Sequence, residues 1–391
     1  LAGELSKRSF GPATAKYREL GTASNLLAFN RLAALPTRNF RESTFEDVEA
    51  LAPETLEKTR ERTRKSCASC TIGCEHLYPL ADGRSARLEY ENLFALGPLC
   101  GVGDPEIVLA ASRACDDLGL DTISAGGTIA FAMECAERGL LDESVGESPP
   151  RFGDGAALLP ILEKIARRAP GLGDLLAEGS RRAAERIGGG SIDFAPQVKG
   201  LEIPGYEPRA LQSLALGFAV GTRGADHNKS GAYEADLSDE VDRLVGDERS
   251  AHAAIETENK AALMDSLILC KFVRGVFANF FEESATLLGA ITGWDVTGAE
   301  LRHSAARIVD LKKAFNIREG WTPALDTLPA RFLSEGLPDG VARGARLPRE
   351  RLQRMIVAYN RARGWSDDGH LDHRSLGDLV PENPRSGDDR S

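Results

Sequence analysis

Apolar residues recur at intervals of three and four along most of this chain, and this periodicity limits the fold more than any other feature of the sequence. Such intervals place the apolar side chains on one face of an α-helix, whereas the alternation typical of half-buried strands is rare and short here. Glycine or proline follows several of these segments, as is common at helix ends. The segments that we expect to be helical are 107–118, 158–169, 175–187, 261–273, 301–315 and 352–362. The sequence therefore predicts a mainly α fold.

The chain has 391 residues, which is enough for two or three domains of roughly 150 residues each. Turn-forming residues gather in "GGGSIDFAPQVKG", residues 188–200, and favour a boundary there. We therefore predict two helical domains, at residues 1–191 and 192–391. Because the first residue is Leu rather than Met, we also expect the chain to be part of a longer protein.

Acidic residues outnumber basic residues by 59 to 48, and the formal net charge is −11. This balance disfavours a sequence-independent interaction with nucleic acid. No apolar run approaches the roughly 18 residues that cross a bilayer, and no secretory signal pattern is present, so we expect no membrane span and a cytoplasmic location. Cysteines stay reduced in the cytoplasm, and an odd count of seven also argues against a disulfide framework.

Three of the cysteines lie close together in "CASCTIGC", at positions 67, 70 and 74. Three thiolates on a tight, glycine-containing turn can bind one metal centre. A structural zinc site usually combines two short pairs, and a second pair is absent, whereas a four-iron cluster commonly takes three local thiolates and a distant fourth. The spacing favours an iron-sulfur cluster over zinc, packing or redox chemistry. The candidates for the fourth ligand are Cys100, Cys115, Cys135 and Cys270.

Two hexapeptides, "DDLGLD" (116–121) and "DSLILC" (265–270), share a similar pattern. We expect the first to close a helix and the second to lie within one. An ionised Asp near a helix end can accept hydrogen bonds from the N–H edge of a flat heterocycle. The alternative for the first hexapeptide is a simple helix stop at Gly119 with solvated aspartates. The second ends in Cys270, which would place a candidate thiolate beside a candidate cofactor contact.

Two further segments carry groups suited to proton transfer. His227 lies in the polar, glycine-flanked "RGADHNKSG" (223–231), as either a proton carrier or a surface histidine. Glu89 and Glu91 precede an apolar run in "LEYENLFALGP" (88–98). They are either ordinary helix N-terminal acids or carboxylates directed into a cavity.

Together these segments resemble the aldehyde:ferredoxin oxidoreductase family, whose members carry tungsten, rarely molybdenum, on two pterin dithiolenes beside a [4Fe-4S] cluster. The resemblance follows the family order through "CASCTIGC", "LEYENLFALGPLCG", "CDDLGLDTIS", "VKGLEIPGYEPRA", "GTRGADH", "DSLILCKF", "FNIREGWTPALDTLPARF" and "YNRARGW". It covers the second and third domains of the family. It implies two helical domains that would pack against a β-rich N-terminal domain absent from this chain.

The resemblance also implies roles for individual residues. The implied cluster ligands are Cys67, Cys70, Cys74 and Cys270, which leaves Cys100, Cys115 and Cys135 structural. The implied pterin contacts are Asp116, Gly119, Leu120 and Asp121 in the first motif, Asp265 and Leu269 in the second, and Lys229. Ile268 occupies the position of the glycine that the family has in the second motif. This difference leaves the carboxylate and the thiolate in place, but it affects how closely the backbone can approach the cofactor.

The activity implied by the resemblance is oxidation of a small aldehyde to a carboxylate, with electrons passing through the cluster to ferredoxin or a dedicated electron-transfer subunit. Glu91 would be the general base toward water or the hydrated aldehyde, and His227 would hydrogen-bond the carbonyl oxygen. One alternative is a low-potential reductase of a carboxylic acid or an aromatic thioester, and another is a cluster-bearing electron-transfer subunit. Residues 109–115, "LAASRAC", lack the E-x-x-H of some members, so a homodimer would form without that metal bridge.

Overall fold

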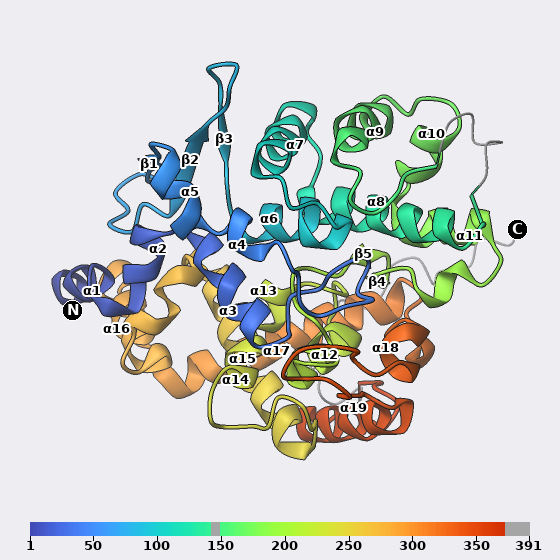
Figure 1. Cartoon of the computed structure of the whole chain (residues 1–391). Helices are drawn as coiled ribbons and strands as arrows, with labels where there is room; N and C mark the ends of the chain where they lie inside the picture. Colours follow the sequence, from blue (N-terminus) through green and yellow to red (C-terminus); the bar gives the residue numbers. More distant parts are fainter. Residues whose placement is uncertain (142–148, 372–391) are drawn as a thin grey trace, which may run out of the picture.

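The computed structural model describes residues 1–141 and 149–371, and helices dominate them (Figure 1). The α-helices are α1 (Ala2–Ser9), α2 (Ala15–Glu19), α3 (Asn25–Arg31), α4 (Val48–Leu51), α5 (Pro53–Thr59), α6 (Tyr90–Leu96), α7 (Pro105–Leu118), α8 (Thr122–Glu137), α9 (Leu158–Ala166), α10 (Leu172–Leu176), α11 (Gly179–Ile187), α12 (Gln212–Val220), α13 (His227–Ser230), α14 (Tyr233–Asp236), α15 (Glu248–Ser266), α16 (Phe280–Thr292), α17 (Gly298–Arg318), α18 (Ala330–Ser334) and α19 (Arg349–Arg363). Short 3₁₀ helices are η1 (Pro12–Thr14), η2 (Thr22–Ser24), η3 (Pro98–Cys100), η5 (Gly155–Ala157), η6 (Ser191–Asp193), η7 (Lys271–Val276) and η8 (Pro323–Leu325). The prediction of a mainly α fold is confirmed.

The strands form two small antiparallel sheets. Strands β1 (Thr63–Lys65), β2 (Glu75–Pro79) and β3 (Ser85–Arg87) pair in chain order, and β4 (Gln197–Val198) pairs with β5 (Leu201–Glu202). The cysteine run lies in the loop between β1 and β2, so this sheet holds the base of that loop.

Two helices are buried on every side and lie at the centre of the packing. Residues 125–135 of α8 and all of α12 are buried, as expected for helices that are apolar all round. A Cβ added to Gly126 of α8 would lie 2.3 Å from the carbonyl oxygen of Ala95, so this glycine lets α8 approach α6 closely. Helix α6 carries Glu91, so this contact helps to set the position of that carboxylate.

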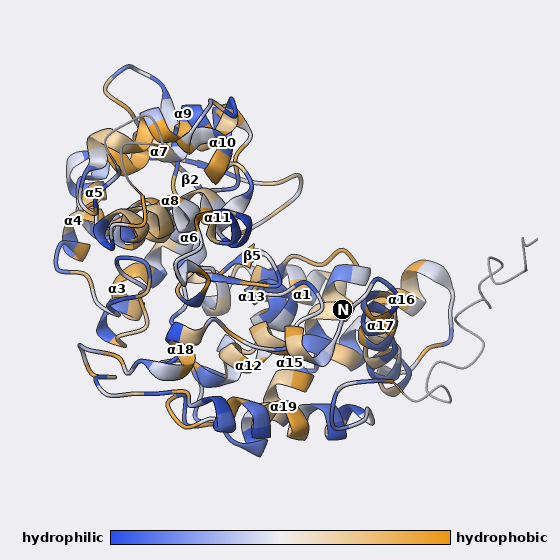
Figure 2. Cartoon of the chain, turned by 90° about the vertical axis from the view of Figure 1, so that its right-hand side faces the viewer, coloured by the Kyte–Doolittle hydropathy of each residue, from blue (hydrophilic) through white to orange (hydrophobic). Residues whose placement is uncertain are grey.

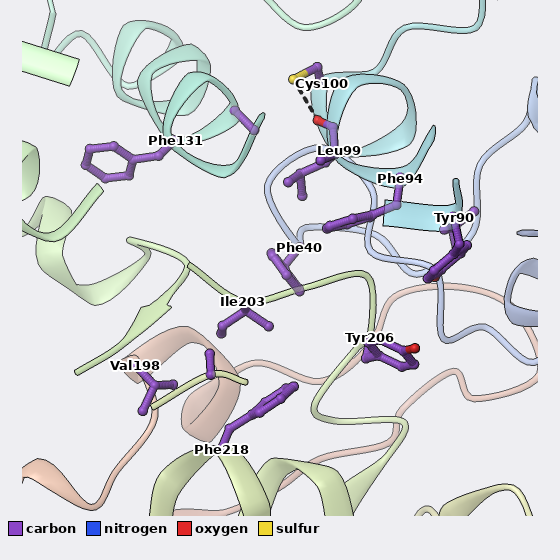
Figure 3. Packing of buried hydrophobic residues seen from close by; sticks show 14 of the residues in the cluster. Phe40, Tyr90, Phe94, Leu99, Cys100, Phe131, Val198, Ile203, Tyr206 and Phe218 are labelled. Carbon is purple, nitrogen blue, oxygen red and sulfur yellow. Dashed lines mark hydrogen bonds between the residues drawn. The ribbon is translucent and has the colours of Figure 1, made fainter. Parts of the chain in front are cut away.

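One apolar core extends from Ala23 to Trp365, with Phe40, Phe94 and Tyr206 among its central aromatic residues (Figure 3). Figure 2 shows α7 to α11 on one side of the molecule and α12, α15 and α19 on the other. The core contains residues from both of these groups. The proposed division at residues 191 and 192 stays a prediction.

A buried ion pair joins α8 of the first group to α18, which lies on the side of α12, α15 and α19 (Figure 2). Arg331 of α18 donates to Glu134 of α8 over 2.7 Å, and both side chains are almost fully buried. Asn39 donates to the same carboxylate over 2.6 Å. The packing between the groups therefore includes a charged centre as well as apolar contacts.

Two of the expected helices are interrupted. Residues 175–187 are divided between α10 and α11, because the backbone at Gly179 has φ +81°. Helix α15 ends at Ser266, so the expectation that "DSLILC" lies within a helix is wrong. Segments 107–118, 301–315 and 352–362 lie within α7, α17 and α19, and 158–169 matches α9 up to Ala166.

In the described ranges, none of the helices is both long enough and apolar enough to cross a membrane.

Candidate functional site

The cysteine loop is a tight turn. The Cys70 amide donates to the Cys67 carbonyl over 3.1 Å, and the Ile72 amide lies 3.4 Å from the Cys70 sulfur. Gly73 has φ +60°, and a Cβ there would lie 2.7 Å from the Ser66 hydroxyl oxygen, so this turn favours glycine. Cys67 is exposed, and Cys70 is partly buried.

Cys270 lies beside this loop, although it follows α15 far along the chain. Burial raises the pKa of the Cys74 thiol to about 11, and the charges of Cys270 and Cys70 add to the effect. Burial likewise raises the pKa of Tyr17, with Cys270 and Cys74 among the contributing charges. The Tyr17 ring stacks on Phe272 at 4.4 Å, two residues after Cys270. The fold thus brings the distant cysteine to the local run.

The other three cysteines are buried in the apolar core. The Cys100 thiol donates to the Ala95 carbonyl over 3.3 Å, and burial raises the pKa of Cys115 and Cys135 to about 12. Thiols held protonated in this way are inert packing groups. They do not join the group around Cys74.

The donor set around Cys74 consists of thiols, which is the donor chemistry of an iron-sulfur cluster. Across residues 1–141 and 149–371, no three Cys, His, Asp or Glu side chains gather tightly enough to hold a single metal ion. A four-iron cluster separates its thiolates more widely than one ion does. By donor type and by proximity of Cys270, these residues fit a cluster.

The two hexapeptides end their helices with the same backbone geometry. In the first, Gly119 has φ +69° and the Leu120 amide donates to the Cys115 carbonyl over 2.9 Å. In the second, Ile268 has φ +57° and the Leu269 amide donates to the Met264 carbonyl over 2.8 Å. This is the left-handed helix C-cap that glycine favours. Ile268 reproduces the backbone of the expected glycine, with its side chain 92% exposed.

Basic side chains pair with the aspartate of each motif. Arg87 donates to Asp116 over 2.9 Å. Lys229 and Lys271 contact the two carboxylate oxygens of Asp265 at 2.6 Å and 3.0 Å. Burial acts to raise the pKa of Asp265, but the hydrogen bonds from both lysines outweigh it and hold the pKa below its usual value. Both carboxylates therefore lie at helix ends beside basic side chains, and the charge of Asp265 is stabilised there.

Asp121 has a structural task that the sequence does not reveal: it is the N-cap of α8. Its carboxylate accepts a hydrogen bond from the Ser124 amide over 2.8 Å. Its charge also acts on Glu91, so the first motif lies near the proposed catalytic acid.

Glu91 and His227 meet at the centre of the site. The distance from Glu91 Oε1 to His227 Nε2 is 3.7 Å, and their side chains are 18% and 14% exposed. The Gly205 amide donates to Glu91 Oε2 over 2.9 Å. Glu91 Oε1 is buried and forms no hydrogen bond within the described part of the chain. A buried carboxylate oxygen without a partner is a group that a substrate or cofactor can engage.

Burial favours the neutral form of both groups. It raises the pKa of Glu91 to about 8, with Asp121 and Glu89 adding to the effect and the Gly205 hydrogen bond opposing it. It lowers the pKa of His227 to about 4, against the charge of Asp226 and together with that of Arg274. At neutral pH the pair is therefore a carboxylic acid beside a neutral imidazole.

His227 begins the short helix α13 rather than lying in an exposed loop. Asp226 caps this helix by accepting from the Asn228 amide over 2.9 Å. The Tyr206 ring lies 5.1 Å from the imidazole and also stacks on Tyr233 at 5.1 Å. Lys229 follows on the same turn and contacts Asp265, so α13 links the Glu91 and His227 pair to the second motif.

Sequence reasoning missed Tyr206, Lys271 and Arg274. Tyr206 shields one side of the imidazole, Lys271 contacts Asp265, and Arg274 lies 5.2 Å above the Tyr233 ring. The only signal in the sequence was position: Lys271 directly follows the second motif, and Tyr206 lies in a segment that matches the family.

The comparisons with known proteins identify the family of the chain. The family model described as "Aldehyde ferredoxin oxidoreductase, domains 2 & 3" matches residues 6–379. The chain belongs to the aldehyde ferredoxin oxidoreductase family. The prediction of this family from the sequence is confirmed.

Two relatives in this family illustrate its range. The chain is 36% identical over 372 residues to a tungsten-containing aldehyde ferredoxin oxidoreductase of Pyrococcus furiosus, a match that covers 92% of this chain and 59% of that protein. It is 27% identical over 385 residues to an aliphatic sulfonate oxidoreductase, WOR-like subunit, of the same organism, covering 94% of this chain and 58% of that protein. The chain thus spans less than two thirds of the length of these curated relatives.

A solved structure shares the fold. The active-site complex of a benzoyl coenzyme A reductase with 1,5-dienoyl-CoA superimposes with a TM-score of 0.71 at 19% identity, covering 93% of this chain and 59% of that one. At this identity the similarity shows the fold alone.

Proposed function

We propose that this chain forms the helical, cofactor-binding part of a tungsten- or molybdenum-pterin oxidoreductase that converts an aldehyde to a carboxylate. The observation that carries the proposal is the buried pair of Glu91 and His227. The first capping motif lies near Glu91, and Lys229 of α13 donates a hydrogen bond to Asp265 of the second capping motif. The names of the relatives supply the metal and the substrate class. Ferredoxin or a dedicated electron-transfer subunit would accept the electrons.

Four cysteines would hold a [4Fe-4S] cluster: Cys67, Cys70, Cys74 and Cys270. The proximity of Cys270 to Cys74 supports this set, because three local thiolates alone leave one iron of a cubane without a protein ligand.

The two capping motifs would bind one pterin each. Their carboxylates can accept hydrogen bonds from the N–H edge of a pterin. The residues proposed for this contact are Asp116, Gly119, Leu120, Asp121, Lys229, Asp265 and Leu269. The ion pairs of Lys229 and Lys271 would keep Asp265 an acceptor at all physiological pH values.

The metal and its dithiolenes would supply the two-electron chemistry when bound. In this proposal neutral His227 donates its ring N–H to the carbonyl oxygen of the aldehyde and so orients it. Glu91, once ionised, takes a proton from water or from the hydrated aldehyde at Oε1, the oxygen without a protein partner. The Gly205 amide holds the other oxygen and fixes the direction of the carboxyl group.

A second activity follows from the protonated state of Glu91 at neutral pH. With a pKa of about 8, the same carboxyl group can donate a proton, which a reductase of carboxylic acids or aromatic thioesters needs. The pH dependence of turnover distinguishes oxidation of an aldehyde, which needs ionised Glu91, from the reductase activity, which needs protonated Glu91. The cytoplasmic location and a homodimer stay predictions.

The test is metal analysis of the full-length protein purified without oxygen. We expect four irons with tungsten or molybdenum for each chain, and loss of iron in Cys270→Ala but not in the matched variant Cys135→Ala, whose thiol is buried in the core. Zinc without iron would contradict the cluster. Iron without tungsten, molybdenum or pterin would leave an electron-transfer subunit instead of an oxidoreductase.

A further inference from the structure

The segment that leads into the cysteine loop is strongly basic and exposed. Five of the eight residues 58–65 are Lys or Arg and one is acidic, in a chain whose net charge is −11. All of β1 is exposed, and the exposure continues through Cys67 to Ser69. A positive segment therefore adjoins Cys67, an exposed member of the proposed cluster ligands.

Three of these basic side chains have no carboxylate partner in the described part of the chain, namely Lys58, Arg64 and Lys65. Arg64 donates to the Arg18 carbonyl over 3.2 Å, and its Nε lies 3.2 Å from the position of a Cβ on Gly73. Its guanidinium group thus lies against the cysteine loop.

An exposed aromatic residue adjoins the same loop. Phe10 is 63% exposed, and the Arg18 guanidinium lies 4.5 Å from its ring centroid. The preceding residue, Ser9, is hydrogen-bonded to Thr71 of the loop over 2.8 Å. Aromatic and arginine side chains dominate the binding energy of protein interfaces, so a Phe and Arg pair at this position suits a docking surface.

We propose that Phe10, Arg18, Arg64 and Lys65, here called the basic face, dock an acidic one-electron iron-sulfur carrier protein in front of Cys67. This inference rests on the proposed function, because it needs a cluster held by the cysteine loop. A cluster held by this loop would supply one electron to the oxidised carrier, with no bond made or broken and no proton moved. A local positive patch on an acidic protein orients such a partner, since the remaining surface repels it.

The experiment compares two electron acceptors with the full-length holoenzyme. An acidic ferredoxin needs to dock, whereas benzyl viologen is a small cation that does not need this face. For Lys65→Glu we expect KM for ferredoxin to rise about tenfold at low salt, with a weaker dependence on ionic strength and an unchanged rate with viologen. Phe10→Ala should raise KM for ferredoxin without altering the salt dependence, because it removes no charge.

The matched control is Arg354→Glu, which reverses an exposed charge on α19, remote in sequence from the loop. It should leave both acceptors unaffected. If Lys65→Glu and Phe10→Ala keep their iron and their KM for ferredoxin is unchanged, the proposal that the carrier docks on the basic face is wrong. This conclusion holds whether the carrier docks on another surface or other residues of the protein cover the basic face. Absence of iron from the unmodified holoenzyme would instead overturn the proposed function, so the two failures are distinguishable. If Lys65→Glu loses iron, Lys65→Gln gives the same comparison with a smaller expected change in KM.

Discussion

Glu91 Oε1 and His227 Nε2 lie 3.7 Å apart, although one residue is in the first turn of α6 and the other begins α13. The Gly205 amide fixes Glu91, and the Tyr206 ring covers the imidazole. Because burial makes both groups neutral at neutral pH, the pair can exchange a proton with a bound substrate without first breaking an ion pair.

The pH dependence of turnover tests the role of Glu91. If Glu91 is the base in aldehyde oxidation, kcat/KM should rise as the pH increases through about 8, where its carboxyl group ionises. Glu91→Gln should lower kcat/KM by roughly 10²- to 10⁴-fold and abolish this rise. His227, with a pKa of about 4, should add no second step in this range.

The control for this experiment is Glu89→Gln, which removes the other acid of the segment and should change kcat/KM by only a few fold. A rate that falls through pH 8 would identify Glu91 as a proton donor and favour the reductase. A profile that is the same in Glu91→Gln and in the unmodified protein would exclude both roles.

Protein stability should carry the same signature. The folded state raises the pKa of Glu91 from its ordinary 4.5 to about 8, so over this interval the folded chain keeps a proton that the unfolded chain has lost. The free energy of unfolding should therefore fall as the pH rises between these values. Glu91→Gln removes this loss, and its stability relative to the unmodified protein should improve by at most about 1.4 kcal/mol per pH unit. Denaturant unfolding at pH 5, 7 and 8.5 measures it.

The opposite sign is expected for His227. Its pKa falls from 6.5 to about 4 on folding, so its contribution to stability is lost as the pH decreases through this interval. His227→Ala should remove the loss of stability that His227 causes as the pH falls from 6.5 to about 4. It should leave the loss of stability that Glu91 causes as the pH rises from about 5 to about 8. Equal effects of both variants at every pH would show that burial does not perturb these groups.

Ile268 should be a site where glycine stabilises the protein. A β-branched residue at φ +57° carries backbone strain of about 1–2 kcal/mol, and its side chain is 92% exposed, so little packing is lost on its removal. After the entropy cost of glycine, Ile268→Gly should gain about 1 kcal/mol. Thermal unfolding of the two proteins measures the gain.

The reciprocal substitution is Gly119→Ala at the matching position of the first motif. A Cβ there meets no atom within 4 Å, so any loss, expected at about 1 kcal/mol, comes from the positive φ alone. A destabilised Ile268→Gly would mean that the isoleucine side chain makes a contact that compensates for the strain.

The buried ion pair of Arg331 and Glu134 should contribute strongly to stability. Both side chains are almost fully buried, so Arg331→Met leaves Glu134 with fewer partners and should cost about 3 kcal/mol. The matched variant is Arg138→Met, which removes a half-exposed partner of the same carboxylate and should cost about 1 kcal/mol or less. If the two variants lose the same free energy of unfolding in guanidinium, burial does not make the Arg331 and Glu134 pair more important than the half-exposed Arg138 contact.

The sequence by itself determined the helical class, the positions of several long helices, the closure of α7 at Gly119 and, through its motifs, the family. The first three of these features depend on residues within a turn or two of one another, so periodicity and capping residues are sufficient to predict them. The same local reasoning was wrong for "DSLILC", because an isoleucine adopts the backbone that normally requires glycine. It also missed the division of residues 175–187 at Gly179, since glycine does not always interrupt a helix.

Only the tertiary structure decided which distant residues meet and which charges they carry. The approach of Cys270 to Cys74, the ion pair of Lys229 with Asp265 and the contact of Glu91 with His227 depend on how α6, α13 and α15 pack around one core. No local pattern encodes these distances. The pKa values of Glu91 and His227 follow from the burial that this packing produces, so the chemistry of the site is a property of the folded core rather than of the segments that carry it.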